Sequence, residues 1–242
     1  MGTKRIGIMQ PYFFPYIGYF HLISAVDVFV IYDNVKYTKR GWINRNRFLE
    51  QGAASTFSVP VKKASDSLNI DQREVADSFD RQKLLRRLSQ AYRKAPQFDT
   101  TFALVRDAVL HSNSNLYDYI ENSLRCLLEY LSIEKTILRS SSVEIDHSLR
   151  GQDKVIAICS ALDATSYVNA IGGTELYDTD HFQDHAIELR FVESHLRVYE
   201  QFDQPFVPWL SILDMLMFNP VNVVRADALE GYSLIPKPAA VV

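Results

Sequence analysis

The order of segments in the first 32 residues places the strongest constraint on the fold. An apolar run at 6–9 stops at Pro11, a helical pattern covers 17–26, and a second apolar run covers 28–32. Strand, helix and strand within about thirty residues are typical of a βαβ unit, whose right-handed crossover makes its two strands parallel. The chain is therefore expected to begin a parallel sheet.

The rest of the chain continues this alternation, which indicates an α/β protein. We expect a mainly parallel sheet with a helical block inserted in the middle, at about 79–131. The block either covers the sheet or forms a lobe of its own, and we expect one domain over residues 1–242 with a single core. The tail after Gly231 is expected to be frayed. The predicted strands lie at 56–61, 136–138, 166–168 and 187–192, and the predicted helices at 79–94, 98–111, 116–131, 151–162 and 210–218.

Composition argues against several classes of function. The 26 basic and 29 acidic residues give a net charge of −3, which disfavours a charge-driven nucleic-acid binder. No apolar stretch has the length of a membrane span or the form of a signal peptide, so we expect no membrane insertion. Cys126 and Cys159 form no CxxC pair and follow apolar neighbours, which favours buried thiols over disulfides and suits a cytoplasmic location.

Parallel sheets bind their ligands at the carboxyl ends of the strands. The loops that would follow the predicted strands are therefore candidates for the functional site, at 10–16, 33–47, 139–142 and 169–174.

The first candidate segment, residues 9–21, lies between a strand end and a helix start. Backbone N–H groups and the helix dipole can receive an anion there, with Gln10 and Tyr12 in the loop. Gly18 either allows close backbone approach to a ligand or only relieves packing. His21 either binds phosphate or acts as an acid or base, or it is an ordinary surface residue of the helix.

The second candidate segment combines an aspartate with a basic and aromatic stretch. Arginine gives planar recognition of phosphate or carboxylate, tryptophan offers a stacking face, and an aspartate after a strand can orient an amine or hydroxyl. If the stretch is extended, side chains at every second position share one face. The alternative is a solvated charged strand with a partly buried tryptophan. The residues are Asp33, Lys39, Trp42, Asn44, Arg45, Asn46 and Arg47.

Two further turns are candidates. Ser140 and Ser141 come after an apolar strand, and their hydroxyls and amides could bind an anion or simply cap the next segment of the chain. Gly172 and Gly173 form either a close-approach loop or an ordinary turn.

No standard catalytic or metal motif is present in the sequence. GxxxxGK(S/T), GxGxxG, GxSxG and HExxH are all missing. His181 and His185 have i, i+4 spacing but lack the acid of a zinc motif, so we expect no metal site.

The N-terminal residues together resemble the opening signature of the WbqC-like family, and later matches extend the resemblance to about Asn219. This family is associated with bacterial gene sets for O-antigen and other surface polysaccharides. Some relatives come from sets that make amino sugars with amide-linked acyl or aminoacyl groups, which implies an amide-forming step on a nucleotide-linked amino sugar. The matching residues are Met9-Gln10-Pro11, Pro15, Gly18-Tyr19-Phe20, 27–30, Asp33, Trp42, Asn44-Arg45-Asn46, 92–96, Ser140-Ser141, Gly172-Gly173 with Tyr177, and 210–214.

A weaker resemblance concerns residues 18–23 followed by Asp27. This stretch is similar to the HxGH region of pantothenate-synthetase-like nucleotidyl transferases, with Tyr16 where the first histidine of that motif would stand. It implies an alternative reaction, in which ATP activates a carboxylate before its transfer to an amine.

The resulting hypothesis is an enzyme that acylates or aminoacylates an amino sugar. Lys39, Arg45 and Arg47 would hold phosphate or carboxylate groups, and Trp42 would stack on a base or sugar. Asp33 would orient the amine, and His21 would move a proton or bind phosphate. The donor is left open between a carrier-protein thioester, a coenzyme A thioester and an acid activated by ATP. The alternative class is a non-catalytic module that binds a nucleotide-linked sugar or a partner enzyme, and the sequence leaves the oligomeric state open.

Overall fold

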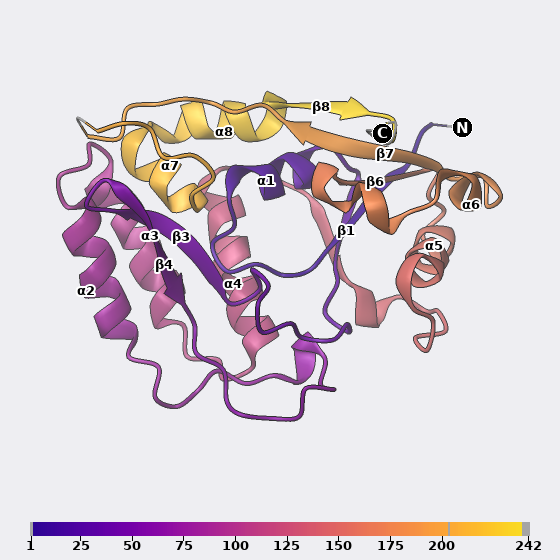
Figure 1. Cartoon of the computed structure of the whole chain (residues 1–242), viewed down its shortest axis with the longest axis horizontal. Helices are drawn as coiled ribbons and strands as arrows, with labels where there is room; N and C mark the ends of the chain where they lie inside the picture. Colours follow the sequence, from indigo (N-terminus) through magenta and orange to yellow (C-terminus); the bar gives the residue numbers. More distant parts are fainter. Residues whose placement is uncertain (1, 203, 239–242) are drawn as a thin grey trace.

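The central element is a six-stranded sheet with the order β5-β2-β1-β6-β7-β8. The structure is a computed structural model that describes residues 2–202 and 204–238. All neighbouring pairs are parallel except β7 and β8, which are antiparallel. The expected α/β class with a mainly parallel sheet is confirmed (Figure 1). The strands are β1 (Arg5–Met9), β2 (Val28–Ile31), β5 (Thr136–Arg139), β6 (Ser166–Ala170), β7 (Glu188–Ser194) and β8 (Tyr232–Ile235).

The βαβ start forms because β1 is buried on both faces by its neighbours. β1 pairs with β2 in the register Ile6↔Val28 and Ile8↔Val30. Helix α1 (Ile17–Ser24) crosses close to β1 at Gly7, where an added Cβ would lie 3.4 Å from Leu22 Cδ1. A larger residue at this position would push the helix away from the strand.

Helices cover both faces of the sheet, and each face has its own buried apolar cluster. Strand residues alternate between the clusters, as with Phe29 in one and Val30 in the other. The first cluster also contains side chains of the helical block, so this block shares its core with α1 and one sheet face. The helices of that cluster are α2 (Arg81–Tyr92), α3 (Phe98–Leu110), α4 (Leu116–Tyr130), α7 (Ile212–Phe218) and α8 (Val221–Glu230), whereas α5 (Gly151–Ala161) and α6 (Thr179–Gln183) cover the other face.

A separate antiparallel hairpin consists of β3 (Arg45–Glu50) and β4 (Ala53–Ser58). Gln51 and Gly52 connect the strands with φ of 54° and 76°, the left-handed backbone that tight hairpin turns require. Glu50 accepts two hydrogen bonds from Arg87 of α2, at 2.9 and 2.6 Å. The expectation that 33–47 is entirely loop is therefore wrong at its end, because residues 45–47 belong to β3.

The C-terminal segment also differs from expectation. The sequence predicts a frayed tail after Gly231, but Tyr232–Ile235 pairs with β7 in the register Phe191↔Ile235 and Ser194↔Tyr232. A four-residue strand carries little local signal, and its stability comes from the β7 edge that it meets. Residues 239–242 lie outside the described part of the chain.

Most other predicted elements are found within a few residues of their expected bounds. The helices expected at 79–94, 98–111, 116–131 and 151–162 correspond to α2–α5. The helix expected from 210 begins at Ile212 because the Ser211 hydroxyl accepts a hydrogen bond from the Leu213 amide. No helix within 2–202 and 204–238 is long and apolar enough to cross a membrane.

Candidate functional site

The carboxyl ends of β1, β2, β5 and β6 lie at one edge of the sheet, because these strands are parallel. The candidate loops at 10–16, 33–44, 139–142 and 169–174 therefore start from the same edge, as expected. The chain passes from β1 through β2 to β5 on one side, and then returns to β6 on the other side of β1. In open α/β sheets, ligands bind at such a reversal of strand order.

Asp33 lies directly after β2 and is 2 % exposed. Its Oδ1 accepts hydrogen bonds from the Ser140 hydroxyl at 2.7 Å and the Ser141 amide at 2.9 Å, and its Oδ2 accepts one from the Ser141 hydroxyl at 2.5 Å. The structure thus brings two predicted candidate segments together. The serines hold a carboxylate of the chain itself.

Lys154 of α5 approaches this carboxylate from another element. Its side chain is 4 % exposed, its Nζ lies 3.2 Å from the Asn34 carbonyl oxygen, and it stands 5.5 Å from the centre of the Tyr32 ring. Burial lowers the pKa of the Lys154 amine, and the negative charges of Asp33 and Asp71 offset part of this effect.

Asp71 completes a cluster of three ionisable groups with Asp33 and Lys154, which we call the strand-end cluster. It lies in a short 3₁₀ helix, η1 (Ile70–Gln72), and its amide donates to the Asp33 carbonyl oxygen at 3.2 Å. The Asp71 Oδ1 atom is buried and has no hydrogen-bond partner. Burial, together with the charge of Asp33, raises the pKa of the Asp71 carboxyl.

Arg139, at the end of β5, is held in place beside the cluster by two carboxylates and an aromatic ring. Its Nη2 donates to Asp118 Oδ1 at 2.9 Å and to Glu121 Oε2 at 2.7 Å, and the guanidinium lies 4.4 Å from the centre of the Tyr117 ring. The Tyr117 hydroxyl is buried without a partner. Burial raises the pKa of this phenol, with Glu121 and Asp33 adding to the shift.

The predicted residues of the 10–16 loop and α1 are held by aromatic packing. The Gln10 carbonyl oxygen accepts from the Tyr19 hydroxyl at 3.0 Å, and the rings of Tyr12 and Tyr19 lie 5.4 Å apart. An added Cβ on Gly18 would overlap the Tyr16 ring. Gly18 therefore has the packing role that was one of its two interpretations.

His21 lies in a different surrounding from Asp33. It is fully buried, so its interpretation as a surface residue is wrong. Its Nδ1 is 2.9 Å from the Ser194 hydroxyl and its Nε2 is 3.9 Å from Asp227 Oδ2. Burial lowers the pKa of His21 to about 4, so the imidazole is neutral at neutral pH. The structure does not bring His21 and Asp33 together, since their partners belong to separate elements.

Trp42, Arg45 and Arg47 form an exposed group, which we call the Trp42 face. The two guanidinium carbons lie 5.4 and 5.5 Å from the centre of the indole ring, which is 42 % exposed. Arg45 donates to the Gly41 carbonyl oxygen at 2.9 Å and Arg47 to that of Trp209 at 3.0 Å. Arg45 and Arg47 share one side of β3, as alternate residues of an extended strand do, and Trp42 lies against both.

The other predicted residues of this stretch point elsewhere. Asn44 donates to the Val59 carbonyl oxygen at 2.7 Å, and the buried Asn46 donates to that of Phe14 at 2.8 Å. Both asparagines therefore brace the backbone. Lys39 is 69 % exposed and pairs with Asp66 at 2.7 Å.

The two glycines after β6 differ from each other. An added Cβ on Gly173 would lie 2.6 Å from the Asn169 Nδ2 atom, whereas one on Gly172 would meet nothing within 4 Å. Gly173 is therefore a close-approach position for the buried Asn169 side chain.

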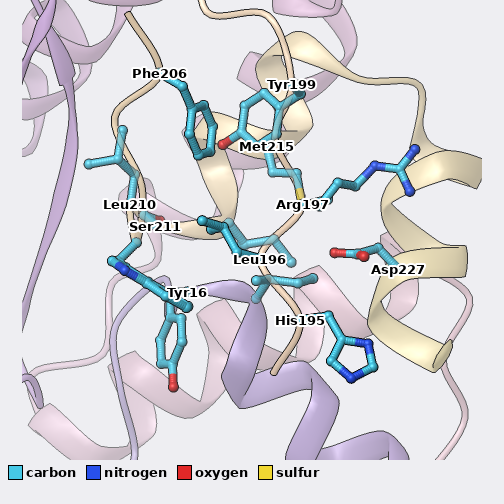
Figure 2. Close-up of a pocket in the computed structure, with 13 residues that line it drawn as sticks. Tyr16, His195, Leu196, Arg197, Tyr199, Phe206, Leu210, Ser211, Met215 and Asp227 are labelled. Carbon is cyan, nitrogen blue, oxygen red and sulfur yellow. The ribbon is translucent and has the colours of Figure 1, made fainter. Parts of the chain in front are cut away.

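A small cavity lies away from the strand-end cluster (Figure 2). Aromatic and aliphatic side chains, among them Tyr16, Phe206 and Met215, line it, with Arg197 and Asp227 at one end. Its volume is about 30 Å³, which is room for a water molecule or two and far less than a nucleotide needs.

The described residues contain no group of three or more His, Cys, Asp or Glu side chains arranged to hold a metal ion. His181 instead pairs with Asp153 at 3.0 Å.

Sequence reasoning missed Lys154 and Asp71. A signal for Lys154 was present, because it stands four residues before Ile158 on the buried side of α5. A lysine on the apolar face of a helix must find a polar partner. Asp71 gave no such signal, since it lies in a polar segment without clear periodicity.

Comparison with known proteins identifies the family of the chain. The chain is 29 % identical over 221 residues to a Mycobacterium tuberculosis protein named "Uncharacterized protein Rv1507c", and the match covers 89 % of this chain and 94 % of that protein. The profile of the WbqC-like protein family matches residues 10–226, which include every residue of the strand-end cluster and the Trp42 face. The chain therefore belongs to the WbqC-like protein family.

Proposed function

We propose that this chain is an enzyme of surface-polysaccharide biosynthesis that transfers an acyl or aminoacyl group to the amine of a nucleotide-linked sugar. The observation that carries the proposal is the strand-end cluster, with its buried lysine and two carboxylates at the ligand-binding edge of the sheet. The link to surface polysaccharides rests on the family resemblance.

The cluster is costly to the fold, and this supports a functional role. An ion taken out of water costs several kcal/mol unless close partners compensate for it. Lys154 has only a carbonyl oxygen within hydrogen-bond distance, and Asp71 Oδ1 has no partner. Buried groups with unfilled hydrogen-bond capacity and shifted pKa values gather at sites that bind or transform ligands.

The chemistry of the cluster suits an amine substrate. Carboxylate oxygens accept hydrogen bonds from an amine, and a lysine that has lost its proton can accept one from it. Asp33, Ser140 and Ser141 form the rigid base of this site, and Gln10 and Gly173 belong to neighbouring strand ends.

The Trp42 face offers a place for the nucleotide part. Its indole is open to stacking, and its two arginines hydrogen-bond only to backbone oxygens in the structure. Their remaining N–H donors and their positive charges suit a diphosphate.

The acyl donor would be an acyl thioester on coenzyme A or on an acyl carrier protein. A free acid activated by ATP is the alternative donor, and would make the enzyme a ligase. Either donor supplies an activated acyl carbon to the same amine.

A second candidate is a binding module that holds the nucleotide-linked sugar without transforming it. One observation favours it: Asp33 already accepts three hydrogen bonds from Ser140 and Ser141, which leaves its carboxylate little capacity for chemistry.

The test combines a thermal-shift screen with a turnover assay. The screen uses nucleotides, nucleotide-linked amino sugars, acyl-coenzyme A compounds and ATP, and a ligand at about a hundred times its Kd adds roughly 2.7 kcal/mol to stability. We expect stabilisation by a nucleotide-linked amino sugar and amide product when the donor is added. Arg45→Ala should lose the shift, and Arg86→Ala, an exposed arginine of α2, should keep it. Binding without product from any donor would replace the transferase by the binding module, and no binding at all would refute both.

A further inference from the structure

The residues that meet the substrate amine can be separated from those that only support them. Asp33 Oδ1 accepts two hydrogen bonds and Oδ2 accepts one from Ser141, so this carboxylate is committed to the loop after β5. The neutral His21 has its contacts with Ser194 and Asp227. Asp33 therefore has little free capacity, whereas His21 Nε2 has no hydrogen-bond partner and faces only Asp227 at 3.9 Å.

Lys154 has free capacity at the end of the sheet. Its Nζ contacts the Asn34 carbonyl oxygen at 3.2 Å, and Asp33 and Asp71 affect its pKa through their charges rather than through hydrogen bonds. The amine therefore uses one of its donor positions and leaves the others, or a lone pair when it is neutral, for a ligand.

Asp71 has the complementary capacity. Its Oδ1 is buried without a partner, and its backbone is tied to Asp33 through the 3.2 Å amide contact. The charges of Asp71 and Asp33 act on Lys154 through space. The Asp71 carboxyl also interacts with the backbone N–H groups of Asp71 and Gln72. A substrate amine that displaces the groups now shielding Oδ1 from solvent would supply the hydrogen bond that this atom lacks.

We propose that Asp71 holds the acceptor amine and that Lys154 is the general base that takes the proton from this amine. This inference rests on the proposed transferase function and assigns the reacting groups of that site. Asp33 then becomes a positioning residue that keeps the loops of β2 and β5 together.

The step conserves atoms and charge. The amine nitrogen attacks the acyl carbon of the thioester, the C–N bond forms, and the C–S bond breaks with its electron pair going to sulfur. The proton of the amine moves to Lys154 Nζ, which later passes it to the thiolate. A positioned base of this kind typically contributes a factor of about 10² to 10⁴ in rate.

The protonation state of Lys154 is set by its surroundings. Burial favours the neutral amine, whereas Asp33 in the loop after β2 and Asp71 in η1 favour the charged form. The Tyr32 ring lies beneath the amine, and His147 contacts the Asn34 side chain at 2.9 Å. Activity should therefore rise with pH as Lys154 loses its proton.

The first experiment measures this protonation without any substrate. The full-length protein is labelled with ¹³C,¹⁵N-lysine, and the Lys154 side-chain signal is identified by its absence from Lys154→Met. We expect it to titrate at lower pH than free lysine measured in the same buffer. Asp71→Asn should lower the midpoint further, because a negative charge is removed. A signal that titrates at the pH of free lysine or above it would overturn the inference.

The second experiment uses the acceptor and donor found in the screen. Lys154→Arg keeps the positive charge but cannot act as a base at neutral pH, and we expect kcat to fall at least 10²-fold with unchanged acceptor KM. Small primary amines added to Lys154→Ala should restore part of the rate. Lys83→Arg is the matched control and should match the wild type.

Asp71→Asn tests the binding of the acceptor amine separately from proton transfer. We expect it to raise the acceptor KM by about tenfold or more, whereas Asp77→Asn, an exposed aspartate of the same segment, should not. Turnover within twofold of wild type in Lys154→Arg would refute Lys154 as the base while leaving the transferase function intact. If the wild type itself forms no product, the proposed function fails, and this inference falls with it whatever the titration shows.

Discussion

Two of the regions that bury ionisable side chains differ in how those groups can be satisfied. In the first region, His21 Nε2 and Asp227 Oδ2 both lack a hydrogen-bond partner but face each other at 3.9 Å. In the strand-end cluster, Asp71 Oδ1 has no such neighbour, and Lys154 has only a backbone oxygen.

The two regions lie beside different strands, the His21 region at β7 and β8 and the strand-end cluster at β2 and β5. His21 lies within α1 and packs against the Tyr232 ring, 5.6 Å away, among elements that surround it completely. The strand-end cluster lies where β2 and β5 stop and the ladder hydrogen bonds end. Burial therefore produces a neutral histidine in one place and, in our proposal, the reacting groups in the other.

The sharpest test of this comparison replaces the same residue type in each region. We expect Asp33→Ala to lower turnover by about 10³-fold, because the loop that carries Ser140 and Ser141 loses its anchor and the reacting groups lose their geometry. Asp227→Ala should leave turnover within about twofold. Kinetic assays of both variants provide the measurement, and equal losses would remove the distinction between the regions.

The buried His21 should make the stability of the protein depend on pH. The pKa of His21 is lowered from 6.5 to about 4. Between these two pH values, His21 therefore binds a proton in the unfolded chain but not in the folded chain. Stability from this group is complete above about pH 6.5 and is lost as the pH falls toward 4, by roughly 3 kcal/mol. The raised pKa of Asp227 acts in the opposite direction.

Urea unfolding of the wild type and His21→Gln between pH 7 and pH 4.5 measures this loss. The variant should show a weaker decline in its free energy of unfolding. Parallel curves for the two proteins would contradict a histidine that is held neutral.

The Trp42 face should show a smaller effect, limited to binding. Trp42→Ala should raise the KM for the nucleotide-linked sugar by about tenfold, since one stacking contact is worth roughly 1–3 kcal/mol. The melting temperature should hardly change, because the ring is 42 % exposed. Isothermal titration calorimetry gives the affinity, and an unaltered Kd would place the nucleotide elsewhere.

The smallest effect is expected at Lys39. Its side chain is exposed and already pairs with Asp66 at the surface. Lys39→Ala should therefore leave both the melting temperature and the sugar KM unchanged within error. A clear rise in KM would restore Lys39 to the phosphate-binding set predicted from the sequence.

Local pattern was sufficient for the elements that begin the sheet. The apolar runs at 6–9 and 28–32 and the helical pattern between them became β1, α1 and β2. Their periodicity reports burial directly, and this also held for α2–α5. The strand β8 was missed because its four residues are held only by their pairing with β7.

The candidate site was predictable only in part. Asp33, Ser140 and Ser141 were chosen because each comes after an apolar strand, and parallel strands bring such loops to one edge. The partner of the serines was unpredictable, since Ser140 and Asp33 are 107 residues apart. Asn44 and Asn46 looked like ligand donors but bond to backbone oxygens of Val59 and Phe14.

The sequence by itself determined that the chain forms an α/β protein of the WbqC-like family with its polar loops at strand ends. Hydrophobic periodicity and turn residues act over short distances along the chain, so they can be recognised in the sequence alone. Only the tertiary structure decided which polar groups are satisfied and which are left open. That outcome depends on contacts between distant segments, such as Lys154 beside Asn34 and Asp71 beside Asp33, and on the loss of water that shifts their protonation.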